Sequence, residues 1–201
     1  MLANYRTSRG KVFTFFVVLL IVLTNVLYRG GTQAHGQAAD GAPISHAIRA
    51  DRLVLAFYYA WYQPKDWCTC HMSTLPTIRY NSTDDATIER QINWAAHAGI
   101  TGFINSWWGP GDKTDHNFAK LLTHADSLQK RTRYPFASTL YIESDAPALH
   151  SQTRMVNGLR YITSQYSNNP HFLHWHGRPV LFFWDPLGNG RTLALWASIR
   201  Q

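Results

Sequence analysis

Four short apolar segments, each bounded by polar or turn-forming residues, dominate the hydrophobic pattern of this chain. They cover residues 53–59, 100–105, 136–142 and 179–183. Runs of this length between turn signals are typical of buried β-strands, and an amphipathic helical pattern follows each of the first three. The sequence therefore predicts an α/β fold built from parallel βα units.

The helical segments have recognisable ends. The first is predicted to have Ser82 or Thr83 as its N-cap and Gly99 just past its last residue. The others are predicted over about 115–130, from 152 to about 167, and from about 192 onward. Each of the first three should pack its apolar side against the sheet.

The strand starts lie about 36 to 47 residues apart, a spacing normal for a (β/α)8 TIM-type barrel whose loops carry function. Such a barrel typically needs about 250 residues, and only four units are visible here. We expect residues 51–201 to hold the first four βα units of a truncated barrel. The alternative is a smaller open α/β domain, which would leave a hydrophobic sheet edge exposed.

The N-terminal region has the pattern of an export signal. Residues 12–28 carry no charge, and Arg6, Arg9 and Lys11 precede them. We expect residues 1–36 to be a secretory signal peptide or an uncleaved membrane anchor, and both alternatives stay open. Residues 37–50 form a polar linker. Either alternative places the remaining chain outside the cytoplasm, secreted or tethered to a membrane.

The net charge does not indicate nucleic-acid binding. The 201 residues carry a formal charge of +7, but four of the 19 basic residues precede residue 30, where no acidic residue occurs. Without them the net charge is about +3, and the remaining basic residues are scattered. Nucleic acid is therefore not an expected partner.

Cys68 and Cys70 are the two cysteines of the chain, and His71 follows them. We expect two loop thiols or a strained disulfide across one intervening residue. A zinc site using His71 and distant histidines is the alternative, although no second cysteine cluster exists to complete a tetrahedral set. The sequence predicts neither a metal nor a cofactor.

Aromatic side chains follow the first two strands at the edge where ligands bind in parallel α/β folds. Tyr59 and Trp61 follow the first strand, and Trp107 and Trp108 follow the second. Alternation can send one of the adjacent indoles into the core while its neighbour faces the mouth, and both are retained as candidates. Aromatic rings stack on the C–H faces of sugars, so a carbohydrate is the expected ligand. The long loop over residues 62–83, which contains Trp67, is either a lid over this edge or a surface insertion.

Acidic side chains follow the third and fourth strands. Glu143 and Asp145 fall on one side of the third strand, and two such carboxylates can share sugar hydroxyls or act as acid and base. Glu143 could instead form a structural ion pair with an arginine such as Arg178. Asp185 follows the fourth strand and either binds a hydroxyl or caps a turn.

Taken in order, several segments resemble glycoside hydrolase family 99 and its endo-α-mannosidase-like relatives. The resemblance rests on AFYYAWY at 56–62, Trp67 and His71 in the following loop, AGITGF at 98–103, SWWG at 106–109, YIE at 141–143 and GRPV at 177–180. It implies a (β/α)8 barrel, retaining hydrolysis of internal α-mannosidic bonds and, in eukaryotic members, an N-terminal membrane anchor. It also implies that the substrate groove is lined by Tyr59, His71, Trp108, Glu143 and Asp145.

One departure from the family pattern is important. Members carry their acid and base in a Glu-x-x-Glu-type motif on a later strand, whereas this chain has only two glutamates, Glu89 and Glu143. We therefore leave the catalytic residues unassigned and expect them beyond Gln201. The expected substrate-binding residues are Tyr59, Trp61, His71, Trp107, Trp108, Glu143, Asp145 and Asp185.

The expected function is that of an exported glycoside hydrolase-like protein acting on α-mannosidic or related polysaccharide linkages. A non-catalytic carbohydrate-binding or degenerate barrel is the main alternative. A metal-assisted hydrolase using Cys68, Cys70 and His71 is a third. The expected partners are an oligosaccharide or polysaccharide and, through the N-terminal segment, a membrane.

Overall fold

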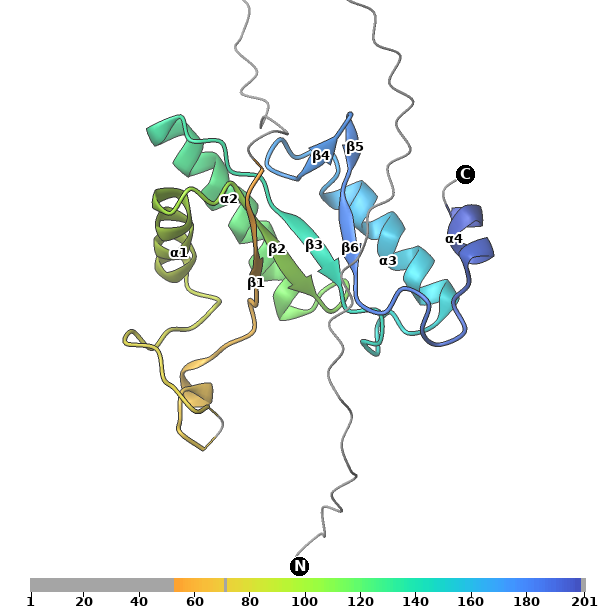
Figure 1. Ribbon diagram of the computed structural model, residues 1–201, viewed down its shortest axis with the longest axis horizontal. Helices are drawn as coiled ribbons and strands as arrows, with labels where there is room; N and C mark the ends of the chain where they lie inside the picture. The colour runs from red at the N-terminus through yellow and green to blue at the C-terminus, as the bar shows by residue number, and fades with distance from the viewer. Residues whose placement is uncertain (1–52, 71, 200–201) are drawn as a thin grey trace, which may run out of the picture. The chain divides into compact units, whose positions relative to one another are not determined.

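A computed structural model describes residues 53–70 and 72–199 (Figure 1). The expected signal or anchor over residues 1–36, the linker over 37–50 and the candidate residue His71 lie outside this range. Among the described residues, no helix has the length and apolar character needed to cross a membrane.

A four-stranded parallel sheet forms the centre of the fold. Its strand order is β1-β2-β3-β6, with bounds Leu55–Tyr58, Gly102–Trp107, Thr139–Ile142 and Leu181–Phe183. Each strand falls within or beside one of the apolar runs of the sequence. The predicted α/β fold of barrel type, with four βα units, is confirmed.

Helices α1 (Asp85–His97), α2 (Lys113–Thr132) and α3 (Gln152–Gln165) pack on one face of the sheet, and α4 (Leu193–Ile199) follows β6 (Figure 1). The sequence also contains elements that its pattern did not predict. They are the 3-10 turn η2 (Pro64–Asp66) and a small antiparallel pair, β4 (His174–Trp175) and β5 (Arg178–Pro179), which precedes β6.

The N-cap of α1 is Asp84, so the prediction of Ser82 or Thr83 was wrong. Ser82 is buried, and its hydroxyl accepts a hydrogen bond from the Tyr62 amide at 3.1 Å. Its side chain therefore ties the end of the first loop to the region after β1. That long-range contact competes successfully with the local capping preference.

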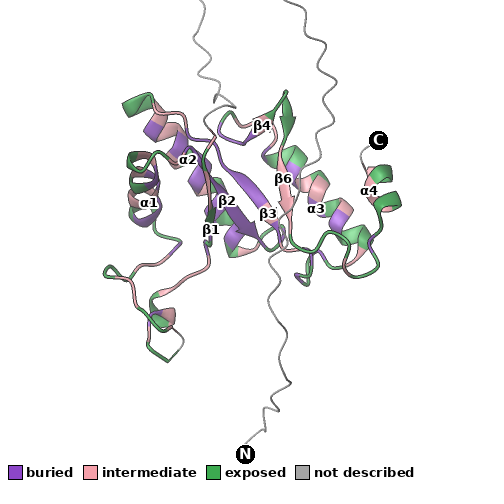
Figure 2. Cartoon of the chain, in the orientation of Figure 1, coloured by how far each residue is buried: buried purple, intermediate pink, exposed green. Residues whose placement is uncertain are grey.

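The core lies between the sheet and the helices, and β2 and β3 are its most buried strands (Figure 2). Alternate strand residues such as Phe103, Leu140 and Ile142 point toward the helices. The residues that alternate with them point to the opposite face of the sheet. The burial pattern therefore separates a structural face from the face that leads to the expected ligand site.

Candidate functional site

Three aromatic side chains form a partly exposed wall at the carboxyl ends of β1 and β2. The ring of Trp61 lies 4.8 Å from that of Tyr59 and 6.1 Å, edge to face, from that of Trp108. Tyr59 and Trp108 are 44% and 42% exposed, so both retain surface for a ligand. This wall, formed by Tyr59, Trp61 and Trp108, is called the aromatic wall below.

A cavity of about 460 Å³ adjoins the aromatic wall, between the first loop and the start of α2; it is lined by Trp61, Tyr62, Asp66, Trp108, Asp112, Lys113 and Thr114. Its volume falls within the range of small-molecule sites. The ammonium of Lys113 donates to the Trp61 carbonyl at 2.9 Å, which links α2 to the first loop. Two indoles with nearby polar groups suit a ligand that has both apolar faces and hydroxyls.

The first loop has an aromatic core of its own. Trp67 is 5% exposed, its indole N–H donates to the Tyr80 carbonyl at 2.5 Å, and its ring stacks on Tyr62 at 4.7 Å. The loop is therefore packed rather than solvated. Trp67 supports the loop and does not itself face a ligand.

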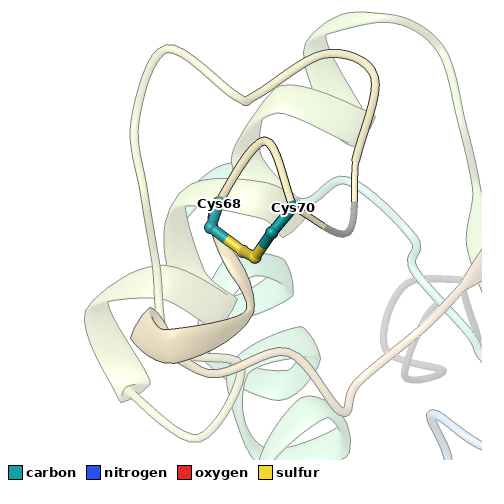
Figure 3. The surroundings of a disulfide bond; sticks show 2 residues. All are labelled: Cys68 and Cys70. Atoms are coloured by element: carbon teal, nitrogen blue, oxygen red, sulfur yellow. A yellow bond between two sulfur atoms is a disulfide. The ribbon is translucent and has the colours of Figure 1, made fainter. Parts of the chain in front are cut away.

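Cys68 and Cys70 form a disulfide in this loop (Figure 3). The disulfide alternative of the sequence is therefore the one adopted. Both sulfur atoms are bonded to each other, so neither thiolate is free for the metal-assisted hydrolase that needed them. The zinc alternative depends on His71, which lies outside the described residues. Within the described part of the chain, no group of three or more metal-ligating side chains comes together.

Glu143 follows β3 and is half-buried beside the Ser106 hydroxyl, which donates to its carboxylate at 2.5 Å. Burial raises the pKa of Glu143, the Ser106 hydrogen bond opposes the rise, and the negative charge of Asp145 adds to it. Among the described residues, no arginine pairs with Glu143. The ion pair with Arg178 that the sequence allowed is therefore not formed.

Tyr141 connects Glu143 to the aromatic wall. Burial raises the pKa of its phenol, and the nearby Glu143 carboxylate and Tyr59 phenol raise it further. Phe57 completes the connection, since its ring lies 5.2 Å from Tyr141 and 6.4 Å from Tyr59. The aromatic wall and Glu143 thus belong to one continuous surface on the face of the sheet opposite the helices.

Asp145 is held by cationic and amide groups that the sequence did not identify as part of the site. The Arg191 guanidinium donates to its carboxylate at 3.1 Å, and the Asn189 amide donates at 2.6 Å. The Arg191 side chain is 2% exposed. Asp145 therefore neutralises a buried cation, and hydroxyl binding is at most a second task for it.

Asp185 takes the turn-forming position that the sequence offered as its alternative role. Its φ is 39°, and its carbonyl accepts hydrogen bonds from Gly188 at 3.1 Å and from Arg191 at 3.1 Å. The Asp185 carboxylate lies over Gly188, where an added Cβ would approach it to 2.0 Å. Its contacts are those of a tight turn after β6.

Trp107 is a correction to the expected substrate-binding set. It is 0% exposed, stacks on Tyr161 at 6.4 Å and donates its indole N–H to Asp115 at 2.9 Å. Alternation along β2 turns it toward the helices, so no ligand can reach it. Its neighbour Trp108 takes the outward position instead.

Comparison with solved structures identifies similar folds. One is a glycoside hydrolase family 99 endo-α-mannosidase from Bacteroides thetaiotaomicron in complex with BIS-TRIS-propane, with a TM-score of 0.55 and 24% identity over 68% of this chain and 42% of that chain. A second structure of the endo-α-mannosidase from that organism gives a TM-score of 0.53 and 22% identity, over 67% of this chain and 46% of that one. The chain thus spans less than half the length of these structures.

No family model matches the chain, and no curated protein does. At these identities the likeness concerns the fold alone. This chain has a glycoside hydrolase-like fold that resembles endo-α-mannosidases of family 99, in agreement with the resemblance carried by the sequence segments.

Proposed function

We propose that this chain is a glycoside hydrolase-like protein that acts on α-mannosidic or related glycans, which it binds at the carboxyl edge of its sheet. The observation that carries the proposal is the aromatic wall of Tyr59, Trp61 and Trp108 on the same surface as the half-buried carboxylate of Glu143. Exposed rings provide stacking faces for sugar C–H groups, and a carboxylate accepts hydrogen bonds from hydroxyls. The family 99 likeness of the fold favours a mannoside among possible glycans.

Glycan binding without hydrolysis is the second candidate, and the bonding of Asp145 favours it. Glycoside hydrolysis generally needs two carboxyl groups about 5 to 9.5 Å apart on opposite sides of the scissile bond. Glu143 and Asp145 rise from one strand end, and Asp145 is engaged by Arg191 and Asn189. We expect these two residues to bind glycan and not to form a catalytic pair.

Titration of the purified chain with an α-mannan oligosaccharide, followed by calorimetry, tests the proposal. Trp108→Ala should weaken binding, whereas Trp175→Ala should not. Trp175 is a matched control because it is 47% exposed and lies on β4, before β6 and away from the carboxyl edge (Figure 1). Equal effects of both variants, or equal affinity for an α-glucan of the same length, would contradict a mannoside site at the aromatic wall.

A hydrolysis assay on the same oligosaccharide separates the two candidates. Binding without release of reducing ends supports a glycan-binding role for the described residues. Turnover that Glu143→Gln abolishes would instead assign Glu143 to the chemistry and contradict the expectation that it only binds.

We also propose that the chain is exported, on the basis of the uncharged residues 12–28 and their basic flank. Cell fractionation of the full chain beside a version without residues 1–36 tests this. Recovery of the full chain in the soluble cytoplasmic fraction would contradict it.

A further inference from the structure

The carboxylate of Asp115 is buried and receives four hydrogen bonds. One oxygen accepts from the Trp107 indole at 2.9 Å and the Tyr166 hydroxyl at 2.7 Å. The other accepts from the Gly111 amide at 2.9 Å and the Tyr161 hydroxyl at 2.7 Å. Asp115 is 2% exposed, so water contributes little to its solvation. Nothing in the proposed binding of glycan uses this group directly.

The four donors come from three parts of the fold. Trp107 ends β2, Gly111 lies in the turn that follows, and both tyrosines belong to the end region of α3. Asp115 itself lies in the first turn of α2. One side chain therefore joins the end of a strand, the next turn and two helices.

Trp108 lies between the two anchored positions, Trp107 and Gly111. Its own amide donates to the Thr114 hydroxyl at 3.1 Å, and that hydroxyl in turn donates to Asp112 at 2.7 Å. Gly109 packs so closely that an added Cβ would lie 2.6 Å from the Ala148 side chain. The turn that presents the Trp108 indole is thus fixed at both ends and has little room to move.

We propose that Asp115 is a positioning residue for the glycan site, which holds Trp108 in the aromatic wall without touching the glycan. The proposal rests on the proposed function for the identity of the ligand. Its geometric part, that Asp115 sets the orientation of Trp108, does not depend on any ligand.

The hydrogen-bond pattern makes this role specific to a carboxylate. All four acceptor directions face donors, so Asp115 accepts throughout and has no place for a donor of its own. Burial raises the pKa of Tyr161 and of Tyr166, and the hydrogen bonds to Asp115 raise them further, so both phenols keep their protons at neutral pH. An asparagine at position 115 would point its N–H₂ group at two of these donors. Those donors would then lack an acceptor, and leaving buried donors unpaired destabilises the folded state.

Asp115→Asn tests the proposal. We expect up to about tenfold weaker binding of the α-mannan oligosaccharide and a shifted Trp108 indole resonance in a ¹H–¹⁵N spectrum, both measured well below the melting temperature. Tyr161→Phe is the matched control because it removes one donor to Asp115 that is not attached to the turn. We expect it to lower the melting temperature while changing the affinity less than twofold.

The possible outcomes distinguish this inference from the proposed function. If Asp115→Asn keeps wild-type affinity and an unshifted Trp108 resonance, the positioning role is refuted. If the wild-type chain does not bind the oligosaccharide, the proposed function fails, and the Trp108 resonance alone decides the positioning role. If Asp115→Asn does not fold, Trp107→Phe replaces it; this variant removes the indole donor at the end of β2 together with part of the buried ring. A shifted Trp108 resonance in that variant supports the proposal, and an unchanged one overturns it.

Discussion

Glu143→Gln should weaken glycan binding and leave the fold intact. Glutamine has the size of glutamate and keeps an oxygen that can accept the hydrogen bond from the Ser106 hydroxyl. In the wild type, that hydroxyl donates to the Glu143 carboxylate at 2.5 Å. What the change removes is the charge. No cation among the described residues pairs with Glu143, so no buried partner is left uncompensated.

The effect on stability depends on pH, and its sign follows from the pKa. Burial raises the folded-state pKa of Glu143 above its ordinary value of 4.5. Between these two values the folded chain binds more protons than the unfolded chain, so stability falls as pH rises through the raised pKa. At neutral pH the buried ionised carboxylate therefore lowers the free energy of unfolding of the wild type, and the Glu143→Gln substitution removes this penalty. Below about pH 4 the carboxyl is protonated in both the folded and the unfolded chain, so the penalty disappears.

The effect on binding can be given a magnitude. A hydrogen bond to a charged group contributes about 1.5–3 kcal/mol, and a neutral one about 0.5–1.5 kcal/mol. Replacing a charged acceptor by a neutral one should thus cost roughly 1–2 kcal/mol, or about 5- to 30-fold in affinity for the α-mannan oligosaccharide. At pH 7 the free energy of unfolding should stay within about 1 kcal/mol of the wild type or exceed it.

Calorimetric titration at pH 7 and urea unfolding at pH 7 and pH 4 measure both effects. Glu89→Gln is the control. Glu89 is the other glutamate; it lies on the surface of α1 and forms an ion pair with Arg131 of α2 at 2.9 Å. It should not alter affinity. Unchanged binding by Glu143→Gln would remove Glu143 from the glycan site. A loss of stability above about 3 kcal/mol at pH 7 would show that Glu143 has a structural partner.

Further substitutions test other parts of the fold and site. Trp108→Ala should lower affinity for the oligosaccharide about tenfold by calorimetry, with a melting temperature near that of the control Trp175→Ala; a large drop in melting temperature would indicate a core role. Asp145→Asn leaves the buried Arg191 cation without its carboxylate and should cost about 2–3 kcal/mol in urea unfolding, less than for a fully buried pair because Asp145 is half exposed. Gly102→Ala should cost more than about 3 kcal/mol, because its Cβ would lie 1.7 Å from a backbone carbonyl oxygen of the segment before β3; near-native stability would contradict this close approach.

The strands were predictable because each is a local apolar run between turn signals. The parallel order followed from the helical pattern between them, since parallel strands need crossover connections. The strand spacing predicted the barrel type, the resemblance to family 99 implied it as well, and the solved structures bear out the likeness of fold. Local periodicity was sufficient wherever the decisive contacts lie within one element.

Long-range contacts account for what the sequence did not predict. Asp145 was expected to face a ligand, but its carboxylate bonds to Arg191, 46 residues further along the chain. The role of Asp115 depends on Tyr166, which is 51 residues away. A spacing rule cannot identify such partners. The one hint in the sequence was that Asp115 is an acidic residue on the otherwise buried side of α2. This position could have suggested that its carboxylate is buried and hydrogen-bonded.

The burial of tryptophans explains how an exposed aromatic wall can be stable. Trp107 and Trp67 are buried, and each uses its indole N–H to bond a fixed acceptor, Asp115 in one case and the Tyr80 carbonyl in the other. Trp108 follows Trp107 directly, and Trp61 belongs to the same loop region as Trp67. The exposed rings of Trp108 and Trp61 are therefore held in place by the buried, hydrogen-bonded tryptophans near them in the chain, and not by their own burial. Because a stacking surface loses less entropy on binding when it is already held in place, this arrangement favours ligand binding at the wall.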